Sequence, residues 1–130
     1  MKKLLLNTVT ILSLAILSSC SKESSTPLPI TKSSIIGKWK KIKTVEEGNE
    51  KTLSNCSKNA VYDYNENDTL YTTYPAEHCG VLSTNKVKYV ISEQNGQGTI
   101  FTYGTENIKF LNANSFELSD NDEVETYQRQ

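Results

Sequence analysis

The chain has 130 residues, with 14 basic residues, 15 acidic residues and one histidine, which gives a formal net charge of −1 at neutral pH. Removal of residues 1–19 on export would take away Lys2 and Lys3 but no acidic residue, leaving 12 basic and 15 acidic residues and a net charge of −3. This balance leaves no basic patch, so we expect no nucleic-acid partner. The length from Gly37 onward suits one small domain and excludes two.

The first residues have the pattern of an export signal. Met1-Lys2-Lys3 is a positively charged start, and the apolar run over residues 4–17 is too short to span a bilayer unaided. The run ends in Leu17-Ser18-Ser19-Cys20, which resembles a bacterial lipobox, where small residues admit the lipoprotein signal peptidase and the cysteine sulfur receives a diacylglycerol. The alternative is an ordinary secretory signal with a nearby cysteine. We predict a signal peptide over 1–19 and lipid attachment at Cys20.

Residues 20–34 are predicted to form the lipidated N-terminus and a flexible linker, because they are rich in serine, threonine and proline and poor in large apolar side chains. Two or three acyl chains on Cys20 would hold the protein stably at a membrane. Lys22-Glu23 resembles the short charged signals that route some lipoproteins to the cell exterior, although incidental charges in a solvated linker explain it equally well. The expected location is the outer membrane, on its periplasmic face or at the cell surface.

After the linker, short strand-like segments alternate with turn residues such as Asn65–Asp68 and Asn95-Gly96. Nearly every connection is short, and no helical period exceeds a turn or two. Sequential hairpins of this kind favour a small up-and-down antiparallel β-barrel over a Greek key. The fold class is therefore all-β, with eight candidate strands over residues 39–45, 60–64, 69–74, 86–91, 99–103, 108–111, 115–119 and 124–129.

The stretch from Ile35 to Trp39 opens this domain. Gly37 allows a tight turn into the first strand, and the indole of Trp39 can lie across the closed end of a curled sheet. Trp39 and Ile42 are three residues apart, which breaks the two-residue alternation of a strand. We therefore expect a bulge, or a twisted and partly exposed first strand. A later segment alternates cleanly and should present one face with Val87, Tyr89 and Ile91.

Four features together resemble the small lipocalin-like domains of Gram-negative envelope lipoproteins. They are the Ile/Leu-x-Gly-x-Trp opening at residues 35–39, a cysteine before the second strand, another after the next hairpin, and a closing Tyr-x-Arg at residues 127–129. The resemblance covers nearly all of residues 35–130 and implies a lipocalin-like barrel that binds a small hydrophobic ligand. Two departures are that Lys41 stands where such openings usually carry an apolar residue, and that the chain is shorter than a transport lipocalin.

Cys56 and Cys79 are the two cysteines that remain if Cys20 is lipidated, and an exported domain lies where thiols are oxidised. A disulfide between them would close a loop of 23 residues and stabilise the fold by about 3 kcal/mol. The rival interpretation is a metal site made by Cys56, His78 and Cys79. Adjacent His78 and Cys79 cannot easily reach one ion, and no fourth ligand has a familiar spacing, so we predict the disulfide and no metal site.

Catalytic motifs are not evident. His78 has no serine or cysteine placed for activation in a recognisable pattern. Glu46-Glu47 is explained as turn chemistry, and so is Asp120–Glu123, which resembles the start of a calcium loop but lacks its glycine and terminal glutamate. The sequence has no phosphate-binding glycine loop or metalloprotease helix. We predict a protein that is not an enzyme and needs no cofactor.

Aromatic residues are the remaining indication of function. If the barrel is open at one end, inward-facing rings could line a pocket for a small apolar ligand, and we take as candidates Trp39, Tyr62, Tyr64, Tyr89, Phe101 and Phe110. The alternative is that these rings simply fill a narrow interior. In that case the domain is an interaction or structural lipoprotein that meets an envelope protein through its outer face or an exposed edge.

Overall fold

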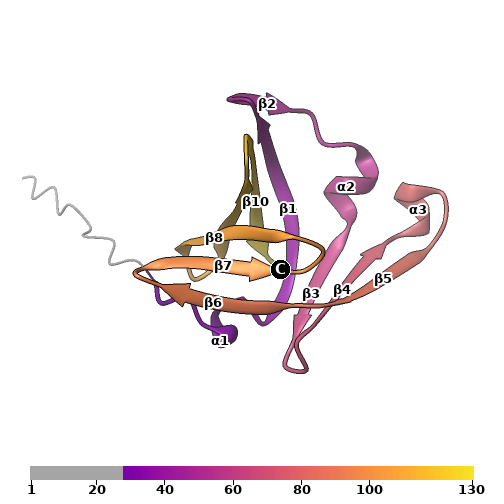
Figure 1. Ribbon diagram of the computed structural model, residues 1–130. Coiled ribbons are helices and arrows are strands. Elements are labelled where there is room, and N and C mark those ends of the chain that lie inside the picture. Colours follow the sequence, from indigo (N-terminus) through magenta and orange to yellow (C-terminus); the bar gives the residue numbers. More distant parts are fainter. Residues whose placement is uncertain (1–27) are drawn as a thin grey trace, which may run out of the picture.

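The computed structural model describes residues 28–130, so the predicted signal peptide and Cys20 lie outside the described residues. Within this part of the chain, ten strands and three short helices follow one another (Figure 1). None of these helices is long and apolar enough to cross a membrane. The strands are β1 (Gly37–Glu46), β2 (Asn49–Lys51), β3 (Val61–Asn65), β4 (Thr69–Tyr74), β5 (Ser83–Lys88), β6 (Val90–Gln94), β7 (Gln97–Phe101), β8 (Thr105–Asn112), β9 (Ser115–Asp120) and β10 (Glu123–Arg129), and the helices are α1 (Lys32–Ile35), α2 (Asn55–Asn59) and α3 (Ala76–Cys79).

All ten strands belong to one antiparallel sheet that curls on itself (Figure 1). Hydrogen-bonded neighbours follow the order β5-β4-β3-β1-β10-β9-β8-β7-β6, and β2 pairs with β1 outside this path. The path begins and ends on strands that are consecutive in the chain, because only Tyr89 separates β5 from β6. These two strands are not hydrogen-bonded to each other, and the first and last strands, β1 and β10, pair in the middle of the sheet. The sheet is a curled half-barrel, which confirms the predicted all-β, lipocalin-like fold.

The eight predicted strands become ten for two local reasons. The short strand β2 folds back on the end of β1. The segment predicted as one strand over residues 86–91 is divided at Tyr89, whose backbone N–H donates to the carbonyl of Asp68 at 3.0 Å and whose hydroxyl donates to the carbonyl of Asn65 at 2.9 Å. Tyr89 thus bonds to the β3–β4 turn, and the chain bends there.

The predicted irregularity of the first strand is confirmed. In the pairing of β1 with β10, Lys41 lies opposite Tyr127 and Lys43 lies opposite Thr126, so Ile42 is an extra residue in β1. The side chain of Ile42 is 51% exposed, whereas Trp39 is fully buried.

The turn at Asn95-Gly96 is tighter than the sequence suggests. Gln94 pairs with Gln97, so the loop has only two residues, and both have positive φ angles of 54° and 77°. These values are typical of the type I′ turns that fit the twist of a hairpin. As a result β6 and β7 extend into residues that were expected to form a longer turn.

The core fills the concave side of the sheet. It contains Ile35, Trp39, Tyr64, Leu70, Tyr89, Ile100, Ile108, Phe110, Phe116, Leu118 and Tyr127. Ile30 packs against this core from the segment expected to be a linker, because it is one of the few apolar side chains there and meets buried residues at one end of the sheet. These core residues, together with Cys56 and Cys79, lie within residues 30–127.

Candidate functional site

Four of the six aromatic candidates pack together inside the sheet. Trp39, Tyr64, Tyr89 and Phe110 are each at most 6% exposed. The ring of Trp39 lies edge-on to Phe116 with 4.7 Å between ring centres, and Tyr64 lies edge-on to Tyr89 at 5.2 Å. These distances are those of direct aromatic packing. The space that the sheet encloses here is occupied by its own side chains.

The other two candidates lie apart from this cluster. Tyr62 is half-buried and packs edge-on against Tyr127, with 5.1 Å between ring centres. Phe101 follows the buried Ile100 in β7 and therefore points to the opposite, outer face, where it is 52% exposed. The structure does not bring Phe101 together with the inner aromatic residues.

The Gly-x-Trp and Tyr-x-Arg motifs meet at one end of the sheet. The guanidinium of Arg129 lies 4.1 Å from the centre of the Trp39 ring and donates to the carbonyls of Ile36 at 2.8 Å and Ser34 at 2.9 Å. A Cβ atom at Gly37 would lie 2.5 Å from Nη1 of Arg129, and Gly37 has a φ of 132°. This close approach explains why the motif requires glycine.

Lys41 faces the inner side of the sheet, as Trp39 does. It forms an ion pair with Glu125 of β10, and its Nζ atom lies 5.9 Å and 5.8 Å from the ring centres of Tyr62 and Tyr127. The Tyr127 hydroxyl donates to the Glu125 carboxylate at 2.5 Å. Burial acts to lower the pKa of Lys41, but the hydrogen bond and negative charge of Glu125 outweigh it and the pKa is raised. A charged amine is therefore held inside the sheet by a matched carboxylate.

Glu106 of β8 belongs to the same polar region. Burial raises the pKa of Glu106, and the negative charges of Glu125 and Asp120 raise it further, while the charge of Lys41 opposes them. Burial also raises the pKa of Tyr62, Tyr64 and Tyr127, so these hydroxyls keep their protons at neutral pH. In this region Glu125 is the group that joins Lys41 and Tyr127.

A cleft of about 650 Å³ opens beside β7 and β8. The pairing of these strands ends at Gly98 and Ile108, so residues 109–112 of β8 extend beyond β7. Leu28 and Ile30 also line the cleft. The lining residues are Leu28, Ile30, Gly96, Gln97, Gly98, Asn107, Ile108, Lys109, Phe110, Leu111 and Ser119, so Phe110 is the one aromatic candidate among them.

Gly98 marks where the N-terminal segment meets the sheet. A Cβ atom at Gly98 would lie 2.6 Å from Cδ1 of Ile30 and 2.9 Å from Cγ2 of Ile108. The backbone N–H of Ile30 donates to the carboxylate of Glu93 at 3.3 Å. The wall of the cleft formed by residues 28–30 is thus fixed against β6 and β7 by packing and by one hydrogen bond.

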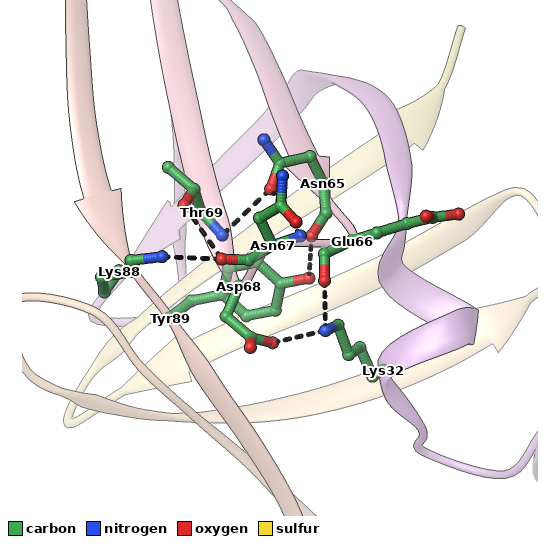
Figure 2. Close-up of polar contacts among 8 residues, drawn as sticks. All are labelled: Lys32, Asn65, Glu66, Asn67, Asp68, Thr69, Lys88 and Tyr89. Carbon is green, nitrogen blue, oxygen red and sulfur yellow. Dashed lines mark hydrogen bonds and ion pairs between the residues drawn. The ribbon is translucent and has the colours of Figure 1, made fainter.

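A smaller cavity of about 390 Å³ lies where β5 passes into β6, and its lining includes Lys32, Lys88 and Tyr89. Figure 2 shows the contacts around it. Lys32 of α1 forms an ion pair with Asp68 at 2.8 Å, and Lys88 donates to the carbonyl of Asn67 at 2.7 Å. These polar groups fasten the β3–β4 turn, which favours a structural role for this region.

The disulfide between Cys56 and Cys79 is confirmed. It joins α2 to α3 with 4.7 Å between the Cα atoms. Nδ1 of His78 lies 3.3 Å from the side-chain nitrogen of Asn55 on the exposed surface. Within residues 28–130 no three histidine, cysteine or acidic side chains are grouped to hold a metal ion.

The sequence did not indicate the cleft. It depends on the unequal ends of β7 and β8 and on Ile30, which was assigned to the linker. Lys41 stood out in the sequence as a charged residue at a usually apolar position. Its partner Glu125 could not be identified in the same way, because it is 84 residues away in the chain.

The comparison with protein families agrees with this architecture. The lipocalin-like domain family matches residues 35–122, from the buried Ile35 to the turn before β10. No curated protein matches the chain. Domains with this fold are generally not enzymes, and their curled sheets are compatible with ligand binding. With more than half of its length matched, and with the curled antiparallel sheet described above, the chain belongs to the lipocalin-like domain family.

Proposed function

We propose that this protein is a non-catalytic, lipid-anchored lipoprotein of the bacterial cell envelope, held at the outer membrane through acyl chains on Cys20. Its lipocalin-like domain binds a small hydrophobic ligand. The binding site is the cleft beside β7 and β8, because the interior of the sheet is filled by its own aromatic side chains.

The observation that carries this proposal is the cleft itself. Its volume of about 650 Å³ lies in the range of small-molecule sites, about 300–1,000 Å³. Five of the eleven residues that line it have large apolar side chains, and of these Leu28 and Leu111 are 38% and 42% exposed. Exposed apolar surface in a concave site gains free energy when a hydrophobic ligand removes it from water.

Uptake of N-phenyl-1-naphthylamine, whose fluorescence rises in apolar surroundings, tests this site. The chain is produced from Ser21 onward, which retains the core residues described above and both disulfide cysteines. Leu111→Lys should weaken uptake at least about tenfold, because it places a charge in the apolar cleft. Leu82→Lys is the matched control, since Leu82 is 66% exposed and does not line the cleft. No uptake by the parent chain, or equal loss in both variants, contradicts the proposal.

The anchor is tested separately in the full chain. Metabolic labelling with an alkyne-bearing palmitate should tag the wild-type protein, and the label should disappear in Cys20→Ala. Cys56→Ala is the control, because Cys56 is held in a disulfide in the folded domain. An unlabelled wild-type protein in the soluble fraction would exclude lipid anchoring at Cys20.

A second candidate function is contact with an envelope protein through the outer face of β6 and β7. Val90 and Phe101 are opposite each other in this pair and are 64% and 52% exposed, and the following Tyr103 is 80% exposed. A photoreactive amino acid at position 103 in intact cells should then form a defined adduct with one envelope protein, and Phe101→Lys should abolish it. Absence of any adduct removes this candidate.

A further inference from the structure

Strand β5 forms one edge of the sheet (Figure 1) and is exposed over most of its length. Among residues 28–130 it pairs with β4 alone, so its second edge has no hydrogen-bonded strand. Residues 83–86 and Lys88 are exposed, and Val87 is half-buried. The preceding Val81 and Leu82 are 71% and 66% exposed. This segment therefore presents unpaired main-chain groups to the surroundings of the protein.

The register of β5 against β4 identifies which main-chain groups lie on this edge. The N–H of Tyr89 donates to the carbonyl of Asp68, the residue that precedes β4, so these two residues are a hydrogen-bonded pair. In an antiparallel ladder, hydrogen-bonded and non-hydrogen-bonded pairs alternate. The N–H and C=O groups of Thr84, Lys86 and Lys88 therefore point away from β4. They form a row of donors and acceptors that fits the backbone of an extended polypeptide.

The sheet edge formed by β6 is covered, in contrast to that of β5. The backbone N–H of Ile30 donates to the carboxylate of Glu93 in β6 at 3.3 Å, and the side chain of Ile30 packs against the core. Covering an edge strand with another segment prevents unwanted strand pairing. Within residues 28–130 the hydrogen bonds of β5 go only to β4 and to the β3–β4 turn. The edge of β5 is therefore open to a partner.

Lysines commonly protect an edge strand, but the two lysines of β5 are directed back across their own sheet. The Nζ atom of Lys86 lies 5.6 Å from the ring centre of Tyr71 in β4. Lys88 donates to the carbonyl of Asn67 at 2.7 Å (Figure 2). Both partners are uncharged, and neither lysine forms an ion pair among residues 28–130. One face of β5 thus carries two positive charges, two residues apart, that do not obstruct the edge.

We propose that β5 binds an extended, acidic segment of a partner protein, which adds to the sheet as a further strand. Main-chain hydrogen bonds to Thr84, Lys86 and Lys88 hold this segment. Its acidic side chains occur at every second position and lie on the same face as the two lysines. A second copy of this chain fits less well, because pairing of β5 with itself brings the lysines of both copies onto one face. The proposal depends neither on the cleft nor on lipid attachment.

Two synthetic peptides test this surface on the chain produced from Ser21 onward. In the first peptide valine alternates with glutamate, and in the second valine alternates with lysine, so the two differ only in charge. NMR titration of the backbone amides should show about tenfold tighter binding of the acidic peptide, because two attractive cross-strand charge pairs replace two repulsive ones.

Amide hydrogen exchange separates strand addition from simple attraction between charges. Bound acidic peptide should slow exchange at Thr84, Lys86 and Lys88, whose N–H groups form the free edge. Exchange at Asn85 and Val87 should change little, because their N–H groups already face β4. A peptide held by charge alone would leave this alternating pattern absent.

Variants of β5 decide what produces the binding. Lys86→Gln should reduce the preference for the acidic peptide to about threefold, because one of two charge pairs is lost. Lys38→Gln is the matched control, since Lys38 is an exposed lysine of β1, which has a paired strand on both sides. Thr84→Pro removes one N–H from the free edge and should weaken binding of the acidic peptide at least about fivefold without removing a hydrogen bond to β4.

Three results would overturn the proposal. The first is unchanged exchange at Thr84, Lys86 and Lys88 at saturating acidic peptide. The second is slowed exchange confined to β6, which would place the peptide at the other edge. The third is slowed exchange at the same three amides when the chain is concentrated without peptide, which would assign the edge to a second copy of this chain.

Discussion

The packed interior of the sheet and the cleft beside β7 and β8 both contain large apolar side chains, but these side chains differ in how much of their surface is exposed. Inside the sheet, Trp39, Tyr64 and Phe116 are at most 2% exposed, and the rings of Trp39 and Tyr64 both pack on Phe116, so they contribute to stability. Beside β8, Leu111 keeps 42% of its surface exposed and borders an open volume. The comparison teaches that an aromatic-rich lipocalin-like sheet can fill its concave side with its own rings and still carry a cleft with exposed apolar side chains beside β7 and β8.

The largest effect is expected from Trp39→Ala. Removing this fully buried indole takes away its packing on Phe116 and the cation–π contact of Arg129, and should lower the free energy of unfolding by about 3–5 kcal/mol. Urea unfolding measures the loss. Phe101→Ala is the control, because this exposed ring should cost less than about 0.5 kcal/mol. Equal costs would contradict the assignment of these two rings to the inner and outer faces.

The next effect is expected from the disulfide, which lies in neither region. Replacing Cys56 and Cys79 together by alanine should lower the stability by about 3 kcal/mol, because the unfolded chain loses the constraint of a 23-residue loop. Urea unfolding of the double variant checks this value. Probe uptake in the cleft should be unchanged at low denaturant. A loss of uptake in the still folded variant would show that α2 and α3 shape the cleft.

A smaller effect is expected at Lys41. Lys41→Met leaves the partly buried Glu125 without its partner and should cost about 2 kcal/mol. Adding Glu125→Leu should recover most of this loss, because no unpaired charge remains. Thermal unfolding of the two single variants and the double variant gives the coupling between the residues. If the stability losses of the two single variants simply add up in the double variant, the ion pair does not stabilise this end of the interior.

A pH-dependent effect is expected at Glu106. Its raised pKa means that ionisation of Glu106 disfavours the folded state, so this penalty is complete above the folded pKa and disappears below the unfolded value of about 4.5. Glu106→Gln should therefore stabilise the protein near pH 7, by at most about 1 kcal/mol after allowance for solvent screening, and should have little effect at pH 4. Thermal melts of the parent chain and of Glu106→Gln at pH 7 and at pH 4 test whether the substitution stabilises the protein only at the higher pH. Glu117→Gln on the outer face is the matched control.

Much of the interior could be predicted from the sequence. The two-residue alternation places Tyr89 on the inner face with Val87 and Ile91, and the three-residue step from Trp39 to Ile42 indicates the bulge that the structure contains. These features are local, so they depend on neighbouring residues alone. The disulfide was predictable because Cys56 has only one partner in the domain.

The cleft could not be predicted in this way. Its shape depends on β8 extending beyond β7 and on Ile30 packing against Gly98, which is a contact between residues 68 positions apart in the chain. The position of Phe101 was equally hidden, because the register of β7 against β6 decides which of Ile100 and Phe101 faces inward. Long-range pairing, and not local pattern, separates the two regions.

Methyl NMR of the isoleucine and leucine side chains during titration with dodecanoate tests the central claim most directly. If the ligand binds in the side cleft, the largest shift changes occur at Leu28, Ile30, Ile108 and Leu111, while Leu70 and Leu118 in the packed interior change little. The largest changes at Leu70 and Leu118, or no changes at the cleft methyls at saturating dodecanoate, would contradict the account.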